Sequence, residues 1–434
     1  MVKSIIKMIN LYIFNETSPG SVYGIGTYIK ELINALKDSN IRICVVHLRS
    51  KREDMEIICM DSINHWYIPD STSTNKSLNK NCQNELYYRN VCYLLKLHIN
   101  EKNKLIFHLN FMHTRLFAEE LRKAFSCKIV HVVHYIGWCF SLFGNNTHFR
   151  TLLQRGGNSI KDLVIKRNFI EEKKLCNFVD NVICLSEYTK ELLHSIYEIN
   201  SSKLHVVYNG LSNTIADLNN KNILRKQFLI SYDTPVILFV GRLDNAKGLQ
   251  YLLRAFRIVL ETLPKCRLFV VGNGIYDIFF KECEDIWASI TFTGRIEKLK
   301  LHELYSISDI GVLPSFNEQC SYVAIEMMMH GLPMIASTST GLCEMIEDGI
   351  SGLHIPVVEF SDKAEIDISL LAEKMLFLLQ NPDERKRMGN NARKRYEKLY
   401  SLNVFRKNML NFYNRLYAPE FGAHSGGGRI SVSE

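Results

Sequence analysis

The sequence lacks several features that mark specialised classes of protein. Its 434 residues contain no Cys-x-x-Cys pair, no zinc-like spacing among 12 cysteines, no repeat and no run of 18 apolar residues. A chain of this length buries a core without disulfides, so we expect reduced thiols in a cytoplasmic protein. The first residues, Met1–Phe14, lack a small-residue cleavage site and are expected to form a buried strand, not a signal peptide. These absences exclude disulfide-stapled secreted scaffolds and membrane channels.

Excess charge of either sign is also small. Lys and Arg number 53 and Asp and Glu number 45, which gives a formal net charge of +8. This bias is compatible with an anionic ligand or a membrane surface, but it is too weak to indicate a nucleic-acid partner. Hydrophobic residues make up 47% of the chain and charged residues 23%, as is typical of globular proteins. A large enzyme or binding protein of two or three domains remains.

What the sequence contains is an alternation of short apolar runs with segments of helical period. Ile5–Phe14 is followed by Thr27–Lys37, whose apolar residues are spaced as on one face of a helix. Further strands are expected at Ile41–Leu48, Lys104–His108, Lys128–His134 and Asn181–Ser186. Strand–helix alternation predicts parallel sheets covered by helices on both faces, and therefore an α/β fold.

The alternation pauses at Ser212–Asp233, a polar and weakly periodic stretch where we expect the interdomain linker. It then resumes, with strands expected at 235–240, 267–271, 290–293, 310–313 and 334–336, and helices at 248–260, 299–306, 322–330 and 383–399. We predict two doubly wound domains, residues 1–210 and 233–400, facing each other across a cleft. A last helix, Leu402–Leu416, and a flexible tail, 418–434, follow.

Two candidate motifs follow strands of the second domain. Gly241 and Arg242 follow the strand expected at 235–240, and Lys247 stands just before the next helix. An arginine fork and a lysine point charge at such a turn suit a diphosphate, although a solvated loop with two unrelated cations is the alternative. Glu318 and Glu326 flank the start of another helix, whose free amides suit a phosphate. Glu318 could instead be only a helix cap. Glu326, among apolar neighbours, needs a polar partner such as a sugar hydroxyl.

The first domain has weaker signals. Gly24 and Gly26 occupy a turn between the first strand and the first helix, which backbone geometry alone would explain. His134 ends an apolar run, where a structural histidine is the alternative to a functional one. His131 precedes it by three residues and so points to the opposite face of the strand, which argues against a shared metal site. No Asp-x-Asp occurs, so the usual acidic clasp for a metal-bound nucleotide is missing.

The ordered motifs resemble those of the family-4 group of retaining glycosyltransferases, which have the GT-B fold of two facing Rossmann-like domains. The similarity covers nearly the whole chain. The matching positions are Gly24 with Gly26, His134, Val182–Glu187, Tyr208–Gly210, Gly241–Gly248, Val271–Gly274, Phe292–Arg295, Pro314–Glu326, His330–Ala336 and Gly341–Gly352.

The resemblance implies roles for these residues. Arg242 and Lys247 would bind the diphosphate of a nucleotide sugar, Glu318 the donor sugar, Glu326 the ribose, and His134 the sugar and acceptor side of the cleft. The remaining donor-binding positions that it implies are Gly24, Gly26, Asn209, Gly241, Gly272, Gly274, Arg295, Ser321, Tyr322 and Val323. The last helix would cross back onto the first domain.

The resemblance also implies transfer of a hexose with retention, without a metal ion or another cofactor. The acceptor would be a glycan, a lipid-linked sugar or a peptide. Peripheral contact with the inner face of the membrane stays open, because the helix at Thr114–Phe125 carries cations beside apolar residues, as an ordinary surface helix also does. A nucleotide-sugar epimerase of the same fold and a non-catalytic sugar-nucleotide-binding subunit are the alternative functions.

The sequence departs from the family pattern at three places. Tyr135 follows the histidine where aspartate is common, and Gln319 follows the first glutamate where glycine is common. Cys139–Gly157 resembles an insertion, which we expect to be a surface loop or an element that recognises the acceptor. These differences bear on the donor sugar and the acceptor more than on the chemistry.

Overall fold

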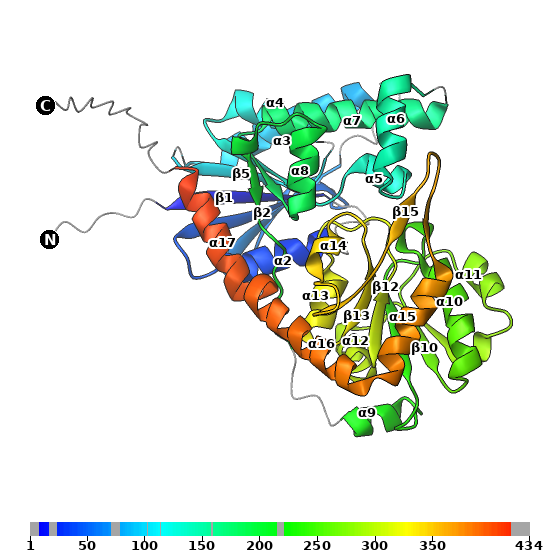
Figure 1. Ribbon diagram of the computed structural model, residues 1–434. Coiled ribbons are helices and arrows are strands. Elements are labelled where there is room, and N and C mark those ends of the chain that lie inside the picture. Colours follow the sequence, from blue (N-terminus) through cyan, green and yellow to red (C-terminus); the bar gives the residue numbers. More distant parts are fainter. Residues whose placement is uncertain are drawn as a thin grey trace, which may run out of the picture.

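The computed structural model describes residues 8–16, 24–70, 79–101, 103–112, 114–157, 159–214 and 221–417. Its strands form one sheet of eight strands, one of six, and a separate two-stranded hairpin. Figure 1 shows the two larger sheets as the centres of two lobes, one above the other, each surrounded by helices. The predicted α/β class with parallel, helix-covered sheets is confirmed.

The eight-stranded sheet forms the first lobe, in the spatial order β3-β4-β2-β1-β5-β6-β7-β8. Its strands are β1 (Ile9–Glu16), β2 (Ile41–Ser50), β3 (Glu56–Met60), β4 (Ile63–Pro69), β5 (Leu105–Leu109), β6 (Lys128–Val133), β7 (Asn181–Cys184) and β8 (Leu204–Val206). All neighbouring strands pair in parallel except β3 with β4. The hairpin β3–β4 was not expected, because its residues are only partly buried and lack a continuous apolar run.

Helices cover both faces of this sheet. They are α2 (Gly24–Leu36), α3 (Lys80–His98), α4 (Arg115–Ala124), α5 (Gly137–Ser141), α6 (Asn146–Arg155), α7 (Ile160–Phe178) and α8 (Glu187–Ser195). Along β1, Leu11 and Ile13 join one apolar cluster, whereas Tyr12 and Phe14 join another. Alternate side chains of a strand point to opposite faces, so the sheet is buried on both sides, as its apolar runs predict.

The six-stranded sheet of the second lobe is entirely parallel, in the order β11-β10-β9-β12-β13-β14. Its strands are β9 (Val236–Val240), β10 (Arg267–Val271), β11 (Ile290–Gly294), β12 (Ile310–Leu313), β13 (Met334–Ser337) and β14 (Gly352–Ile355). The helices around it are α10 (Leu249–Thr262), α11 (Asp277–Glu282), α12 (Lys298–Ile307), α13 (Tyr322–Met329), α14 (Leu342–Met345), α15 (Ile368–Gln380) and α16 (Pro382–Arg395). The strand order reverses between β9 and β12, where ligands of open α/β sheets bind.

The stretch expected to be an irregular linker contains a helix, α9 (Lys221–Gln227). Arg225, 3% exposed, anchors it by donating to Asp309 Oδ2 at 2.7 Å and to the carbonyl oxygen of Ile307 at 2.9 Å. The helix was missed because, of its seven residues, only Leu224 and Arg225 are buried, which gives no apolar stripe in the sequence. Residues 215–220, also part of the expected linker, lie outside the described part of the chain.

The chain ends by returning to the first lobe. A π-helical turn at Tyr396–Tyr400 connects α16 to α17 (Leu402–Arg415), and Figure 1 shows these helices as a long arm joining the two lobes. Tyr413 of α17 contacts His108 of β5, with 2.8 Å between its hydroxyl and Nδ1. The last helix therefore packs on the first lobe. The tail expected at 418–434 lies outside the described residues.

The insertion-like segment 139–157 is not a surface loop. It forms most of α5 and all of α6, and the side chains of Cys139 and Phe149 are fully buried. Trp138 stacks on Phe149 with 4.1 Å between ring centroids. Phe149 therefore forms core contacts within the first lobe, whereas Phe140 is exposed and Phe143 packs against Phe316 of the second lobe.

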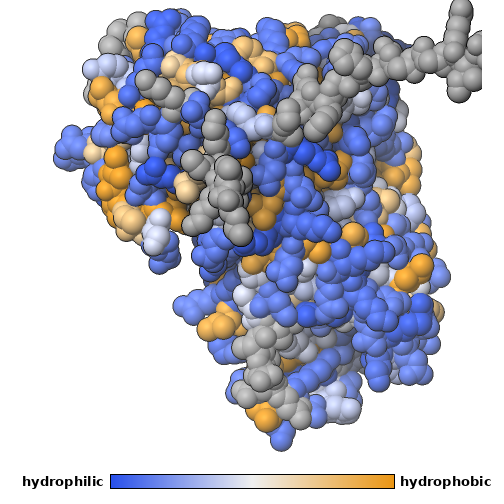
Figure 2. Space-filling view, turned by 90° about the vertical axis from the view of Figure 1, so that its left-hand side faces the viewer, coloured by the Kyte–Doolittle hydropathy of each residue, from blue (hydrophilic) through white to orange (hydrophobic). Residues whose placement is uncertain are grey.

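Two observations describe the surface. In the described parts of the chain, no helix combines the length and apolar character needed to cross a bilayer. Phe117, Ala118 and Leu121 of α4 are buried, so this helix turns its apolar residues inward as an ordinary surface helix does. On the face shown in Figure 2, hydrophilic residues predominate and hydrophobic ones lie in scattered patches.

Candidate active site

The predicted donor residues lie at the carboxyl ends of neighbouring strands in the second lobe. Arg242 follows β9, Gly272 follows β10, Arg295 follows β11, and Glu318 follows β12. Because the four strands are adjacent and parallel, their following loops lie side by side at one edge of the sheet. The structure therefore brings the second-domain candidates together.

Lys247 and Glu318 are in direct contact. Lys247 Nζ lies 2.5 Å from Glu318 Oε1, and the two side chains are only 16% and 19% exposed. Lys247 comes from the loop after β9, at the end of a short 3-10 turn, whereas Glu318 comes from the loop after β12. Glu318 is therefore joined to the predicted diphosphate-binding lysine, rather than capping α13, whose cap is Ser321.

The second predicted cation has its own carboxylate partner. Arg242 pairs with Asp244 at 3.2 Å, and its side chain is 45% exposed. The carboxylate of Asp244 also accepts a hydrogen bond from the backbone N–H of Lys247, at 3.2 Å. Asp244 thus shapes the loop that carries both cations, and sequence reasoning missed it. Its position three residues before Lys247, typical of a helix cap, was the available signal.

Glycine is required where the loops after β9 and β10 meet. Gly272 has a φ of +142°, and a Cβ built there would lie 1.7 Å from the carbonyl oxygen of Gly241. Backbone hydrogen bonds from Gly241 to Val271 (2.9 Å) and from Gly272 to Gly294 (3.0 Å) join these loops. The two glycines thus form a backbone-to-backbone contact. Gly274 belongs to the same contact, and nearby the Arg295 amide donates to Asn273 Oδ1 at 3.0 Å.

Glu326 is buried and has partners on α12. Tyr305 donates a hydrogen bond to its carboxylate at 2.8 Å, and Lys298 Nζ lies 3.7 Å away. Burial raises the pKa of Glu326 above its ordinary value, partly offset by Lys298 and the tyrosine hydroxyl. The partner that the sequence required is therefore a tyrosine and a lysine of the protein itself.

The N-terminus of α13 carries the remaining candidates on this side. Ser321 caps the helix by accepting from the backbone N–H of Ala324 at 3.4 Å. Tyr322 and Val323, half-buried, form its first turn, where amides lack partners within the helix. The hydroxyl of Tyr322 is buried and has no partner among the described residues.

Asn209 bridges the two lobes. Its side chain is 3% exposed and donates through Nδ2 to the carbonyl oxygen of Cys320, at 2.8 Å. Cys320 directly precedes the cap of α13. Asn209 therefore holds the start of α13 from the first lobe. Its part in donor binding stays a prediction.

His134 follows β6 and is held as a neutral ring. Its Nε2 lies 3.0 Å from Asn110 Oδ1, while Asn110 Nδ2 donates to the carbonyl oxygen of Phe14 at 3.0 Å. The amide orientation makes Nε2 the protonated nitrogen and leaves Nδ1 as an acceptor. Burial, with His108 and His131 nearby, lowers the pKa of His134 well below its usual value.

The glycine turn of the first lobe differs from expectation. Helix α2 begins at Gly24, three residues before the expected start, so Gly24 and Gly26 lie in its first turn. Ile25 and Tyr28 are both buried, which extends the apolar face of the helix toward its N-terminus. Residues 17–23, before the helix, are not among those described. Tyr28 packs edge-on against His134, with ring centroids 4.7 Å apart.

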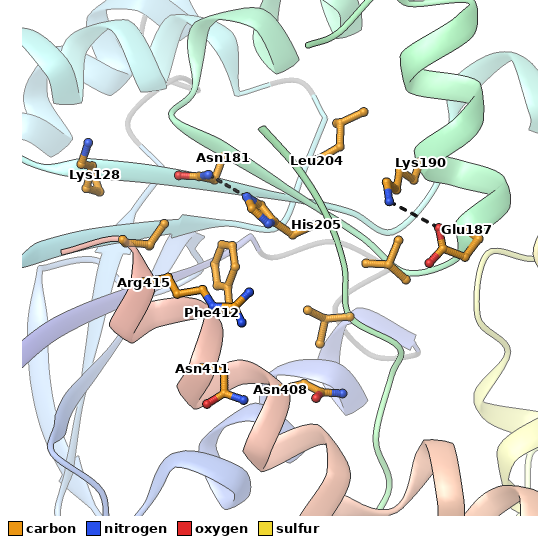
Figure 3. A pocket seen from close by; sticks show the side chains of 13 residues that line it. Lys128, Asn181, Glu187, Lys190, Leu204, His205, Asn408, Asn411, Phe412 and Arg415 are labelled. Atoms are coloured by element: carbon orange, nitrogen blue, oxygen red, sulfur yellow. Dashed lines mark hydrogen bonds and ion pairs between the residues drawn. The ribbon is translucent and has the colours of Figure 1, made fainter. Parts of the chain in front are cut away.

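One cavity lies away from the predicted site residues. It measures about 630 Å³ and lies along β8 between α8 and α17; the described residues that line it include none of the predicted site residues. Figure 3 shows its polar lining, in which His205 receives a hydrogen bond from Asn181 at 2.9 Å. Its lysines have carboxylate partners: Lys190 lies 3.7 Å from Glu187, and Lys128 lies 3.5 Å from Asp180.

Comparisons with known proteins identify the family. A family model described as "Glycosyl transferases group 1" matches residues 220–395, and one described as "Glycosyltransferase Family 4" matches residues 22–213. The two matches are adjacent and together cover most of the chain. The chain belongs to the group 1, family-4 glycosyltransferases.

Individual relatives agree with this assignment. An uncharacterized glycosyltransferase of Methanocaldococcus jannaschii is 30% identical over 54% of this chain and 59% of its own length. The lipopolysaccharide 1,2-N-acetylglucosaminetransferase of Salmonella typhimurium is 28% identical over 52% of this chain and 61% of its own. The matched region thus spans about 60% of each of these two relatives.

Solved structures share the fold of the whole chain. Sucrose-phosphate synthase from Thermosynechococcus elongatus superposes with a TM-score of 0.74 at 20% identity, covering 94% of this chain and 99% of the other. HepE from Anabaena, solved with UDP-glucose, gives 0.69 at 15% identity, covering 94% and 100%. The group 1 family and the two Rossmann-like lobes establish the predicted GT-B fold.

Proposed function

We propose that this protein transfers a hexose from a nucleoside diphosphate sugar to an acceptor hydroxyl, with retention and without a metal ion. The observation that carries the proposal is the contact between Lys247 and Glu318, 2.5 Å apart on loops that follow adjacent strands. Arg242 lies in the same loop as Lys247, and α13 starts four residues after Glu318. Cations, a carboxylate and a helix N-terminus thus converge on one edge of the sheet.

This set of groups matches the chemistry of the donor. The leaving group is a diphosphate whose negative charge grows as the glycosidic bond breaks. Arg242, Lys247 and the amides at the start of α13 would stabilise that charge, as a metal ion does in other enzymes. Glu318 would accept hydrogen bonds from the donor sugar, and Glu326 from the ribose.

Retention follows when the acceptor attacks the face that the diphosphate leaves. The departing phosphate oxygen then takes the proton of the acceptor hydroxyl, so no separate protein base is required. His134 would line the acceptor side as a neutral ring that accepts a hydrogen bond at Nδ1. The half-buried ring, whose pKa is lowered well below its usual value, suits such a role better than proton transfer.

The substrate classes rest partly on named relatives. A structural neighbour was solved with UDP-glucose, and one relative is a lipopolysaccharide N-acetylglucosaminetransferase. We propose a nucleotide-sugar donor and, as acceptor, a glycan, a lipid-linked sugar or a peptide. The domain limits 1–210 and 233–400, a cytoplasmic location and contact with the inner membrane face belong to the same proposal.

The test is a screen of UDP-, GDP- and ADP-sugars in the presence of EDTA. One of them should raise the melting temperature and release its nucleoside diphosphate when an acceptor is present. A ligand at 100 times its dissociation constant stabilises the folded state by about 2.7 kcal/mol, which is readily measured. Loss of all activity in EDTA would contradict the metal-free mechanism.

Product analysis separates the alternatives. The stereochemistry of the new bond, read by NMR, tests retention. An isomerised sugar nucleotide formed without any acceptor would instead indicate an epimerase. Tight donor binding with no turnover on glycan, lipid-linked or peptide acceptors would indicate a binding subunit.

A further inference from the structure

Residues 137–147 of the first lobe reach across to the second lobe. This segment, here called the clasp, includes α5 and the turn into α6 and begins three residues after His134. Figure 1 shows α5 and α6 beside the hairpin formed by β15 (Val357–Glu359) and β16 (Ala364–Ile366), which projects from the second lobe. Most of the clasp belongs to the insertion-like stretch 139–157.

The clasp is anchored in the first lobe by a buried carboxylate. Glu172 of α7 is 1% exposed and accepts hydrogen bonds from the backbone N–H of Gly137 at 3.1 Å and from the Tyr197 hydroxyl at 2.8 Å. Stacking of Trp138 on Phe149 holds the same end. The start of the clasp is thus fixed relative to the first sheet.

Its other end is anchored in the second lobe. Asn145 is 1% exposed and donates both amide hydrogens to the hairpin turn, at 2.7 Å to the Phe360 oxygen and 2.8 Å to the Lys363 oxygen. Its Oδ1 accepts from the backbone N–H of His148 at 2.8 Å, which caps α6. Thr147 adds two hydrogen bonds to Glu359, at 2.9 and 2.8 Å. The Asn145 side chain is fully satisfied only when the lobes are together.

Between these anchors the clasp touches the loops of the candidate active site. The guanidinium carbon of Arg242 lies 5.6 Å from the ring centroid of Phe140, a cation–π contact. Gly144, with a φ of +68°, lies so close to the loop after β12 that a Cβ would stand 2.5 Å from the Phe316 oxygen. Phe316 precedes Glu318 by two residues, and its ring centroid lies 5.9 Å from that of Phe143. The clasp thus contacts the loops that carry both Arg242 and Glu318.

We propose that the clasp assembles the donor site on domain closure, with Asn145 and Phe140 as positioning residues. Asn145 latches the lobes together, and Phe140 then holds the Arg242 guanidinium in the cleft. Neither residue needs to touch the reacting atoms. The inference rests on the proposed function, because Arg242 matters only if a diphosphate binds there.

Asn145→Asp tests the latch. The aspartate keeps the oxygen that caps α6 but replaces two donors with a carboxylate oxygen facing two carbonyl oxygens. Losing both donated hydrogen bonds, and setting a carboxylate oxygen against the two carbonyl oxygens, should lower kcat/KM for the donor by about 10- to 100-fold. The change should appear mainly as a higher KM, because saturating donor pulls the lobes closed again.

The matched control is Asn79→Asp. Asn79 caps α3 in the same way, accepting from the backbone N–H of Cys82 at 3.0 Å, on an exposed helix start. The Asn79→Asp variant should keep the kcat, KM and overall shape of the unaltered protein. Small-angle scattering, with and without UDP, gives the readout that does not depend on activity. Asn145→Asp should enlarge the radius of gyration of the free protein, and equality of the two variants in scattering and in KM would overturn the latch.

Phe140→Leu tests the contact with Arg242. Loss of an exposed cation–π contact should lower kcat by about two- to fivefold, with little change in KM. The same substitution should have no further effect in an Arg242→Ala background. An equal loss in both backgrounds would show that Phe140 does not act through Arg242. If the unaltered protein turns over no sugar nucleotide, the proposed function fails, while scattering of Asn145→Asp still tests the latch.

Discussion

The two lobes orient their candidate site residues by contacts of different range. In the second lobe, the loop after β9 is shaped locally: Asp244 pairs with Arg242 and accepts from the amide of Lys247, only three positions away. In the first lobe, His134 is oriented by Asn110, 24 positions away, and Asn145 by carbonyls 215 and 218 positions away. The loop after β9 is thus shaped within one strand–loop–helix unit, whereas His134 and Asn145 are oriented by distant segments.

This difference explains which motifs are recognisable in the sequence. In a strand–loop–helix unit whose contacts span only a few residues, the functional residues keep a fixed spacing along the chain. The donor loops are therefore recognisable as ordered motifs. Longer-range contacts also occur on that side, such as Lys247 with Glu318, 71 positions apart, and Gly272 against the carbonyl oxygen of Gly241. The clasp has no motif of its own, because its partners are main-chain carbonyls and a hairpin that many sequences could form.

The largest effect should come from removing one of the two donor-side cations. Lys247→Ala and Arg242→Ala should each lower kcat by about 10²–10³, the usual cost of losing one group that stabilises leaving-group charge. Initial rates of nucleoside diphosphate release measure this. A fall of that size would support the local donor loop as the catalytic side of the cleft.

Two variants control for the loss of charge. Lys173 pairs with Glu198 at 2.5 Å, the same distance as in the Lys247 pair, but on the first lobe. Arg254 is 45% exposed, as Arg242 is, and pairs with Glu282. Lys173→Ala and Arg254→Ala should leave the rate unchanged. If all four variants behave alike, the donor loop has no special role.

An intermediate effect, on stability, probes the first lobe. Burial raises the pKa of Glu172 from 4.5 to about 7, although the hydrogen bonds from the Tyr197 hydroxyl and the Gly137 amide act in the opposite direction. The folded state therefore keeps a proton that the unfolded state releases, so the unfolding free energy falls as pH rises from about 4.5 to about 7. Across that pH range, the unfolding free energy of Glu172→Gln should rise by about 3 kcal/mol relative to that of the unaltered protein. Urea unfolding at several pH values measures the difference.

The control for this pH dependence is Glu198→Gln. Lys173 lowers the pKa of the exposed Glu198 carboxyl. The difference in unfolding free energy between Glu198→Gln and the unaltered protein should therefore change with pH in the opposite direction. A difference between Glu172→Gln and the unaltered protein that does not vary with pH would show that Glu172 is ionised in the folded state. The anchor of the clasp would then be a charged carboxylate rather than a protonated one.

The smallest effect distinguishes two helix caps within the second lobe. Ser321 caps α13 at the candidate site, and Asp367 caps α15 by accepting from the backbone N–H of Leu370 at 3.0 Å. Ser321→Ala and Asp367→Ala should each lower the unfolding free energy by about 1 kcal/mol. Only Ser321→Ala should also raise the donor dissociation constant, measured by calorimetry. Equal donor affinities in the two variants would show that the Ser321 cap has no part in donor binding.

Expectation and structure agree where a pattern is local. The strands at 41–50, 128–133, 236–240 and 310–313 follow apolar runs, and α10, α12, α13 and α17 follow helical spacing to within about two residues. The disagreements arise where packing comes from elsewhere in the chain. The helix α9 depends on Arg225, the helix α6 on a stacked tryptophan, and the early start of α2 on the buried Ile25.

The sequence by itself determined the two-sheet α/β fold, the family and the order of the donor motifs, because these depend on periodicity and spacing along the chain. Only the tertiary structure decided that Lys247 contacts Glu318, that Asn209 holds the start of α13, and that the clasp joins the lobes. Each of these contacts joins atoms from different loops. Their positions follow from how the two sheets stack, and no short-range pattern records that arrangement.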